Sequence, residues 1–203
     1  MKKPAVVLFD LGNVLVRIHP EAFLQTLGID TAENRKLYGP KVIEIVKRYE
    51  RGGDSTEQYL SRLEGLLNHG EFHFGREQIE KAMLSVIGKP LEGMEDLVQH
   101  VAASNRVGLL SNTNPLHYHL CLENLPVLRH IPVHFLSYQL LALKPEPAIY
   151  HAVVETIDLP AEEILFIDDI EENITAALGV GVQGIRFTDP ATLEQELKSM
   201  RIV

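Results

Sequence analysis

Short apolar runs, each ending at a small or acidic residue, are the feature that most constrains the fold of this chain. Apolar residues within these runs do not alternate with polar ones, which is typical of strands buried on both faces of a parallel sheet. Helical patterns separate the runs, and such alternation predicts a doubly wound α/β sheet. The predicted strands are residues 5–9, 107–110, 133–136, 164–167 and a weaker run at 184–187.

Two of the intervening segments carry helical periodicity. One repeats its apolar residues at i, i+3, i+4 and i+7, and the other repeats them every four residues behind Pro147, which suits a first helical turn. In an open α/β sheet the ligand site lies beyond the carboxyl ends of the strands. Residues that follow the predicted strands are therefore the first functional candidates. The two apolar patterns are Met94, Leu97, Val98 and Val101, and Ile149, Val153 and Ile157.

The stretch from about residue 16 to residue 87 is too long for a single crossover between strands, and it reads as helical throughout. It contains two apolar stripes separated by a turn at residues 51–54, after which Ser55 and Gln58 match a capping box. We therefore predict a small helical cap, residues 17–87, inserted into an α/β core formed by residues 1–16 and 88–203. The stripes are Val42, Ile45, Val46 and Tyr49, and Tyr59, Leu60, Leu63, Leu66 and Leu67.

Composition narrows the classes of partner. The chain of 203 residues has a formal net charge of −9, and an acidic fold without a concentrated basic patch repels nucleic acid. No run approaches the ~18 apolar residues of a membrane span, and we read the apolar residues before Asp10 as a strand rather than a signal peptide. We expect no nucleic acid and no membrane partner. Cys121 is the only cysteine, so we also expect a reducing, cytoplasmic setting.

Carboxylates close two of the predicted strands. Asp10 follows the first, and Asp168 and Asp169 follow the fourth. Taken alone, Asp10 is a turn residue that bonds its own backbone, and one of the adjacent pair can serve as a helix N-cap. All three at one edge of a sheet repel one another unless positive charge is nearby. They therefore favour a hard cation such as Mg²⁺, which takes oxygen ligands.

Two further groups follow predicted strands. The segment Ser111-Asn112-Thr113-Asn114 offers hydroxyl and amide groups that can donate to phosphate oxygens, although singly these residues suit a loop and helix cap. Lys144 is the first Lys or Arg after Arg129 and precedes Pro145. A lone lysine is usually a solvated surface residue, but this one precedes Pro145, which stiffens the approach to the next helix.

In this order, the Asp10 motif, the Ser-Asn-Thr segment, Lys144-Pro145 and the Asp-Asp pair resemble the four motifs of the haloacid dehalogenase superfamily. The resemblance runs from Leu8 to about Gly179. It implies a Rossmann-like core, and the helical insert looks like the family's cap. Residues 12–14, 50–52 and 111–114 look most like the sugar-phosphate phosphatase branch, which includes glucose 1-phosphate phosphatases.

The resemblance also implies an activity. It is the Mg²⁺-dependent hydrolysis of a small phosphorylated metabolite, most simply a sugar phosphate, through an aspartyl-phosphate on Asp10. It implies metal binding by Asp10, Asp169 and the backbone carbonyl of Gly12, with Asp168 supporting the metal ligands. The phosphoryl group would be held by Ser111, Asn112 and Lys144, of which Lys144 also has a catalytic role.

Gly12 departs from the family pattern, which has a second Asp there as the general acid. General acid–base help contributes roughly 10²–10⁴-fold, so we expect either substrates with better leaving groups, such as sugar 1-phosphates, or an acid from elsewhere. His19 and His117 are the candidates for that acid. The same departure leaves an alternative open, namely a weak or inactive module that binds a phosphorylated ligand or a partner protein. Phosphomutase and dehalogenase chemistry fit these residues less well.

Overall fold

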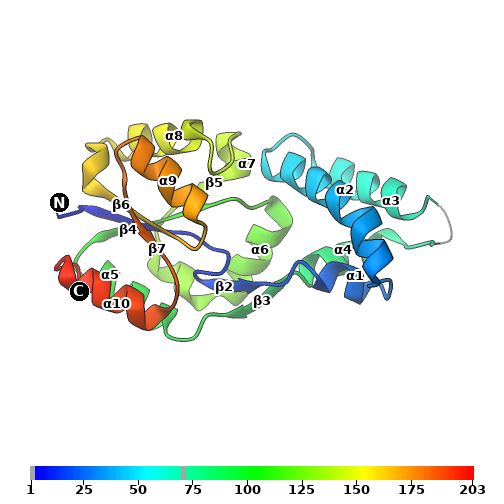
Figure 1. The fold of residues 1–203 in the computed structure, drawn as a ribbon, viewed down its shortest axis with the longest axis horizontal. Helices are drawn as coiled ribbons and strands as arrows, with labels where there is room; N and C mark the ends of the chain where they lie inside the picture. Colours follow the sequence, from blue (N-terminus) through cyan, green and yellow to red (C-terminus); the bar gives the residue numbers. More distant parts are fainter. Residues whose placement is uncertain (1–2, 70–71) are drawn as a thin grey trace.

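The computed structural model describes residues 3–69 and 72–203, and it has two parts. A five-stranded sheet with helices on its faces forms the core, and a group of helices joined to it by a short ribbon forms the cap (Figure 1). Within the described residues, none of the helices combines the length and the apolar composition that a membrane span requires.

The core sheet is parallel throughout, with the strand order β5-β4-β1-β6-β7. Phe9 pairs with Leu109 on one side and with Ile167 on the other. Asp10 therefore leaves its strand at the same level as Leu110 and Asp168, at the carboxyl edge that the sequence indicates. The strands are β1 (Val6–Phe9), β4 (Arg106–Ser111), β5 (Val133–Leu136), β6 (Ile164–Asp168) and β7 (Gln183–Arg186).

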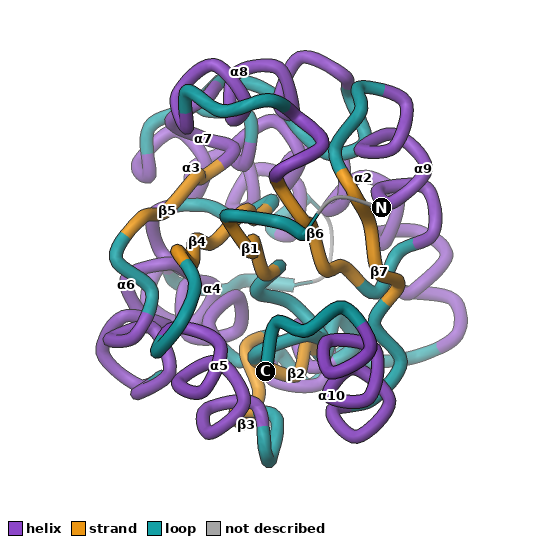
Figure 2. The backbone as a smooth tube through the Cα atoms, turned by 90° about the vertical axis from the view of Figure 1, so that its left-hand side faces the viewer, coloured by secondary structure: helices purple, strands orange, loops and turns teal. Residues whose placement is uncertain are grey.

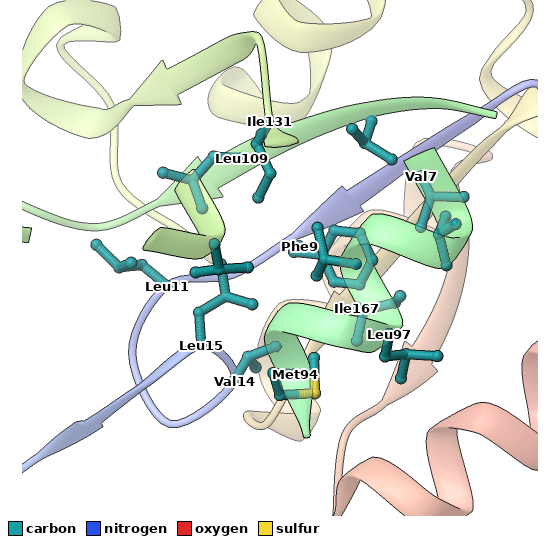
Figure 3. Close-up of a cluster of buried hydrophobic side chains, with 14 of the residues drawn as sticks. Val7, Phe9, Leu11, Val14, Leu15, Met94, Leu97, Leu109, Ile131 and Ile167 are labelled. Carbon is teal, nitrogen blue, oxygen red and sulfur yellow. The ribbon is translucent and has the colours of Figure 1, made fainter. Parts of the chain in front are cut away.

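Helices cover both faces of this sheet, as Figure 2 shows. The faces separate within β1, because Val7 and Phe9 pack into one apolar cluster (Figure 3) and Val6 and Leu8 into another. Burial on both faces explains why the strand sequences do not alternate. One face carries α5 (Met94–Ala102), α6 (Pro115–Asn124), η1 (Pro126–His130) and α10 (Pro190–Ser199); the other carries α8 (Pro147–Ile157) and α9 (Glu171–Gly179), with the short α7 (Ser137–Leu140) and η2 (Ala161–Glu163) beside them.

The cap has an apolar core of its own. Tyr49 stacks on Tyr59 with ring centroids 4.2 Å apart, and Leu63 is fully buried between the helices. The capping box is present, because Ser55 Oγ accepts from the Gln58 N–H and the Gln58 side chain accepts from the Ser55 N–H. The cap helices are α1 (Ala22–Thr26), α2 (Ala32–Glu50), α3 (Thr56–Leu67) and α4 (Arg76–Leu84).

The expectation that residues 16–87 are helical throughout is wrong at both ends. The strand β2 (Val16–Ile18) pairs antiparallel with β3 (Ile87–Pro90), and this ribbon joins cap and core. Strands of three and four residues are too short to produce a periodic signal of their own. We propose 17–87 as the cap and 1–16 with 88–203 as the core, because both boundaries pass through this ribbon.

Truncation of Leu63 tests the cap core. Leu63→Ala is expected to cost about 2–5 kcal/mol of unfolding free energy, because the buried side chain leaves a cavity. Urea unfolding followed by circular dichroism measures this loss, and Leu122→Ala, at a residue 45% exposed on α6, is the matched control with little effect. Equal and small losses in both variants would show that the cap is not packed as described.

Candidate active site

Asp10 lies directly after β1, and the backbone holds it in place. Its N–H donates to the Ile167 carbonyl at 2.9 Å, and its Oδ1 accepts from the Leu11 N–H and from Lys144 Nζ, each at 2.7 Å. No hydrogen bond reaches Oδ2 from the described part of the chain, so this oxygen is available for chemistry. Burial raises the pKa of Asp10 to about 7 against the lowering effect of Lys144, and Asp168 adds to the rise.

Lys144 lies between two carboxylates at the base of the site. Its ammonium contacts Asp10 Oδ1 and Asp168 Oδ2, each at 2.7 Å, and donates to the Leu110 carbonyl at 3.2 Å. An ammonium has three N–H donors, and these contacts use all of them. The ring of Phe166 lies 5.1 Å from the same nitrogen, within the range of a cation–π contact. Burial opposes the charge, but Asp10 and Asp168 outweigh it and leave the pKa of Lys144 raised.

Asp168 ends β6 and is fully buried. Besides its contact with Lys144, the Asp168 carboxylate accepts hydrogen bonds from the Ile170 N–H at 2.8 Å and from the side-chain amide of Asn173 at 3.0 Å. Asn173 is held in turn, because Tyr150 donates to its carbonyl at 2.9 Å. These contacts occupy both oxygens of Asp168. We therefore interpret it as a supporting carboxylate rather than a freely available ligand.

Asp169 is half-buried and lines the cavity beside Asp10. Burial and the charge of Asp168 raise the pKa of Asp169. A hydrogen bond with the Asn13 side chain acts to lower that pKa but does not cancel the rise. Asn13 can reach it because its backbone is in the left-handed region, with a φ of 54° that asparagine tolerates. Its Oδ1 also accepts from the Ile18 N–H at 3.2 Å. One amide thus connects the acidic group to the ribbon that leads into the cap.

The three aspartates fit a magnesium ion. Each offers one oxygen, and these oxygens all lie within 4.8 Å of one another. Octahedral Mg²⁺ binds oxygen at about 2.0–2.1 Å, which puts opposite ligands about 4.2 Å apart. The oxygens therefore lie close enough together to surround one ion, with Asp10 and Asp169 offering the oxygens that are less committed to other partners. Gly12, whose backbone carbonyl the sequence analysis assigns to the metal, lines the same cavity.

The residues that follow β4 differ in what their side chains contact. Ser111 and Asn112 both line the cavity. The Asn112 side chain, however, is bound to the backbone of Lys144: its amide donates to the Lys144 carbonyl at 2.9 Å, and its oxygen accepts from the Lys144 N–H at 2.8 Å. It therefore positions the lysine. Asn114 is the N-cap of α6 and accepts from the His117 N–H at 3.0 Å.

A cavity of about 580 Å³ lies between this edge and the cap, within the range of small-molecule sites. The cap wall is mostly apolar, with Phe23, Val42 and Val46 among its residues, and Glu50 at the end of α2 is an acidic group on that side. Burial raises the pKa of Glu50 to about 7, while Lys144 and Lys47 act to lower it.

The two histidines considered as acids do not suit that role. His117 lines the cavity, but its Nε2 contacts the Met83 carbonyl at 2.9 Å and its Nδ1 contacts the Asn114 amide at 3.1 Å. Burial lowers the pKa of His117, so a neutral, structural ring fits best. His19 is exposed near Glu21 and is not among the residues that line the cavity.

Sequence reasoning did not find three residues of this site. Asn173 follows the Asp-Asp pair by one helical turn, and that spacing was an available signal. Asn13 belongs to the segment 12–14 that resembles the phosphatase branch, but sequence analysis assigned its side chain no role in the site. Glu50 belongs to the segment 50–52 that resembles the phosphatase branch, but nothing in the sequence placed it at the site, because only the packing of cap on core brings the end of α2 to the cavity.

Residues 4–181 match the family described as haloacid dehalogenase-like hydrolase. Among curated proteins, the chain is 27% identical to a D-ribitol-5-phosphate phosphatase of Bacteroides thetaiotaomicron, over 94% of this chain and 95% of the relative. It is also 27% identical to flavin mononucleotide hydrolase 1 of Arabidopsis thaliana, over 99% of this chain and 79% of that protein.

Solved structures agree with these similarities. The crystal structure of a haloacid dehalogenase family enzyme from Bacteroides thetaiotaomicron superposes with a TM-score of 0.82 and 26% identity, covering 93% of this chain and 95% of that one. A magnesium complex of the same enzyme superposes with a TM-score of 0.80 and 26% identity over the same shares of both chains.

Replacement of Lys144 by Met tests the balance of buried charge. Asp10 and Asp168 would stay buried without their counter-charge, so we expect a loss of about 3–5 kcal/mol of unfolding free energy at pH 8. Lys144 lowers the pKa of Asp10, so its removal raises that pKa further. A raised folded-state pKa gives stability at low pH that is lost as pH rises through it. The loss should therefore be smaller at pH 5.

Urea unfolding at the two pH values measures this difference in a metal-free buffer. Lys41→Met, at an exposed residue of α2, is the matched control and should change little at either pH. A Lys144→Met loss that is the same at both pH values would contradict the assigned role of Asp10 and Asp168.

Proposed function

Since this chain belongs to the haloacid dehalogenase-like hydrolase family, we propose that it is a Mg²⁺-dependent phosphatase acting on a small phosphate monoester through an aspartyl-phosphate on Asp10. The observation that carries the proposal is the placement of Asp10, with its Oδ2 free of hydrogen bonds from the described residues, beside a buried ammonium and two further carboxylates at one edge of the sheet.

Charge is the main obstacle to this reaction. Two unit negative charges 4 Å apart repel by about 4 kcal/mol at an effective dielectric constant near 20, and a phosphate dianion adds such charge beside the aspartates. The positive charge of Lys144, which lies between Asp10 and Asp168, offsets part of this negative charge. Asp10, Asp169 and the Gly12 carbonyl, with Asp168 in support, would hold a magnesium ion, which would supply further positive charge to the phosphoryl oxygens.

The residues of the chain then have distinct roles. Asp10 Oδ2 attacks phosphorus, the bond to the leaving oxygen breaks, and water later hydrolyses the aspartyl-phosphate. Ser111 would bind the phosphoryl group, and Lys144 would act on it through its positive charge, since its three N–H donors already have partners. The Asn112 side chain keeps Lys144 in position. Asn173 and the Ile170 N–H orient Asp168. Positioning and charge stabilisation supply most of the catalysis in phosphoryl transfer.

We propose a sugar or polyol phosphate as the substrate class. The similarity to a D-ribitol-5-phosphate phosphatase supports this class, and the cavity volume of about 580 Å³ suits a molecule of that size. Glu21, Asp30 and Arg35 line the outer part and can bind hydroxyl groups. Glucose 1-phosphate remains a prediction from the sequence. A cytoplasmic setting is also proposed, in keeping with the single, buried Cys121.

Gly12 supports one alternative, a module that binds a phosphorylated ligand or a partner protein through the cap and turns nothing over. The absence of an acidic side chain at this position removes the usual proton donor for the leaving group. Turnover itself separates the alternatives, because a binding module would retain affinity for phosphate esters without releasing phosphate.

A phosphate-release assay tests the proposal directly. We expect release from ribitol 5-phosphate, glucose 1-phosphate or a related ester in Mg²⁺, and loss of that release with a chelator or in Asp10→Asn, which removes the nucleophile. Asp96→Asn, the same change at an exposed residue of α5, should keep the activity. Tight binding of these esters without any phosphate release would support the binding module instead.

A further inference from the structure

The proposed function leaves one proton without a donor. Breaking the ester bond produces an alkoxide, which is a poor leaving group unless an acid protonates it. Gly12 has no side chain to do so, and His117 has both ring nitrogens in other contacts. An acid for the leaving oxygen must therefore reach the cavity from another element.

Glu50 is held where cap and core meet. It is the last residue of α2, and its backbone carbonyl accepts from Ser137 Oγ at 2.6 Å. Ser137 is fully buried, and its Oγ also accepts from the Thr113 N–H at 3.0 Å, on the loop that follows β4. One hydroxyl thus connects the end of a cap helix to the loop that carries Ser111 and Asn112.

The next two cap residues also contact the core. Arg51 forms a bidentate ion pair with Glu146 at the start of α8. Gly52 has a φ of 74°, and a Cβ there would lie 2.4 Å from the Tyr138 carbonyl, so only glycine allows this approach. Three consecutive cap residues are therefore fixed against α7 and its neighbours, and the position of Glu50 is set by backbone contacts.

The Glu50 side chain, in contrast, has no hydrogen-bond partner among the described residues. It lines the same cavity as Asp10, Gly12 and Lys144. Across residues 3–69 and 72–203, no donor hydrogen-bonds to its carboxyl group, and its resolved interactions are with the charges of Lys144 and Lys47. A half-buried carboxyl that receives no hydrogen bonds from these residues favours its protonated form. The raised pKa, about 7, agrees with this, since it provides a large protonated fraction near neutral pH.

We propose that Glu50 is the general acid of this enzyme and replaces the side chain that Gly12 lacks. As Asp10 Oδ2 bonds to phosphorus and the ester P–O bond breaks, the Glu50 carboxyl gives its proton to the leaving oxygen, which departs as an alcohol. Water then attacks the aspartyl-phosphate and returns a proton to the Glu50 carboxylate, which releases phosphate and restores Asp10.

The groups that face Glu50 set its response to pH. Lys144 from the core and Lys47 from its own helix lower its pKa, and burial outweighs both. Tyr59 on α3 lies near enough for the charge of Glu50 to raise its own pKa, so it stays neutral. His117 from α6 is held neutral by burial, which lowers its pKa, and Asp10 shares the cavity. The acid form of Glu50 should therefore be lost as pH rises through its pKa of about 7.

Substrates with different leaving groups test this role. Glu50→Gln should lower kcat/KM for an alkyl phosphate, such as ribitol 5-phosphate, by about 10²–10⁴-fold. It should change the rate on p-nitrophenyl phosphate little, because a stabilised phenolate leaves without a proton. Activity on the aryl ester also shows that the variant is folded. Glu44→Gln, the same change at an exposed residue of α2, should leave both rates unchanged.

The pH profile and a compensating variant complete the test. The wild-type alkyl phosphate rate should fall as pH rises above the Glu50 pKa of about 7, and Glu50→Gln should lack this limb. Gly12→Asp in the Glu50→Gln background should recover part of the alkyl phosphate rate, once Ile18 Cγ1, which would lie 3.1 Å from the new Cβ, shifts slightly. An equal fall on both esters, or no fall on either, would overturn the role of Glu50. If wild-type protein releases no phosphate from either ester, the proposed function itself fails.

Discussion

The buried ammonium of Lys144 is the interaction on which the rest of the site depends. Asp10 and Asp168 leave adjacent parallel strands at the same level, and without a cation between them two buried carboxylates would repel strongly. The fold supports the lysine with the Leu110 carbonyl, the ring of Phe166 and the side chain of Asn112. Each of these contacts comes from a strand or the loop after it, so the parallel register is what assembles the charge.

Core and cap contribute different chemistry to one cavity. The core supplies the charged groups, and backbone and amide contacts hold them rigidly. The cap supplies mainly apolar side chains, together with charged ones that include Glu50. Apolar walls exclude water, and electrostatic interactions are stronger where water is excluded. The apolar cap therefore strengthens the interactions of the core residues, and it also raises the pKa of the carboxyl group that it brings to the cavity.

Residue patterns predicted the core well because its strands are buried on both faces, so that each apolar run and the polar residue after it mark an edge of the sheet. They failed for β2 and β3, which are too short for periodicity. The assignment of Asn112 to the phosphoryl group stays a prediction; residue type did not reveal that its side chain binds the Lys144 backbone. Glu50 and Asn173 depend on packing between segments far apart in sequence, which spacing does not encode.

Gly12 and Glu50 can be understood together. A Cβ at residue 12 would lie 3.1 Å from Ile18, which belongs to the ribbon that carries the cap. Glycine at this position leaves room for the Ile18 side chain beside the residue that follows Asp10 by two. The core then has no acidic side chain at this position. If the acid lies on the cap, proton transfer requires the contacts of Ser137 and Glu146 that seat the cap on the core. Proton transfer to the leaving oxygen would then be possible only while these contacts hold the cap against the core.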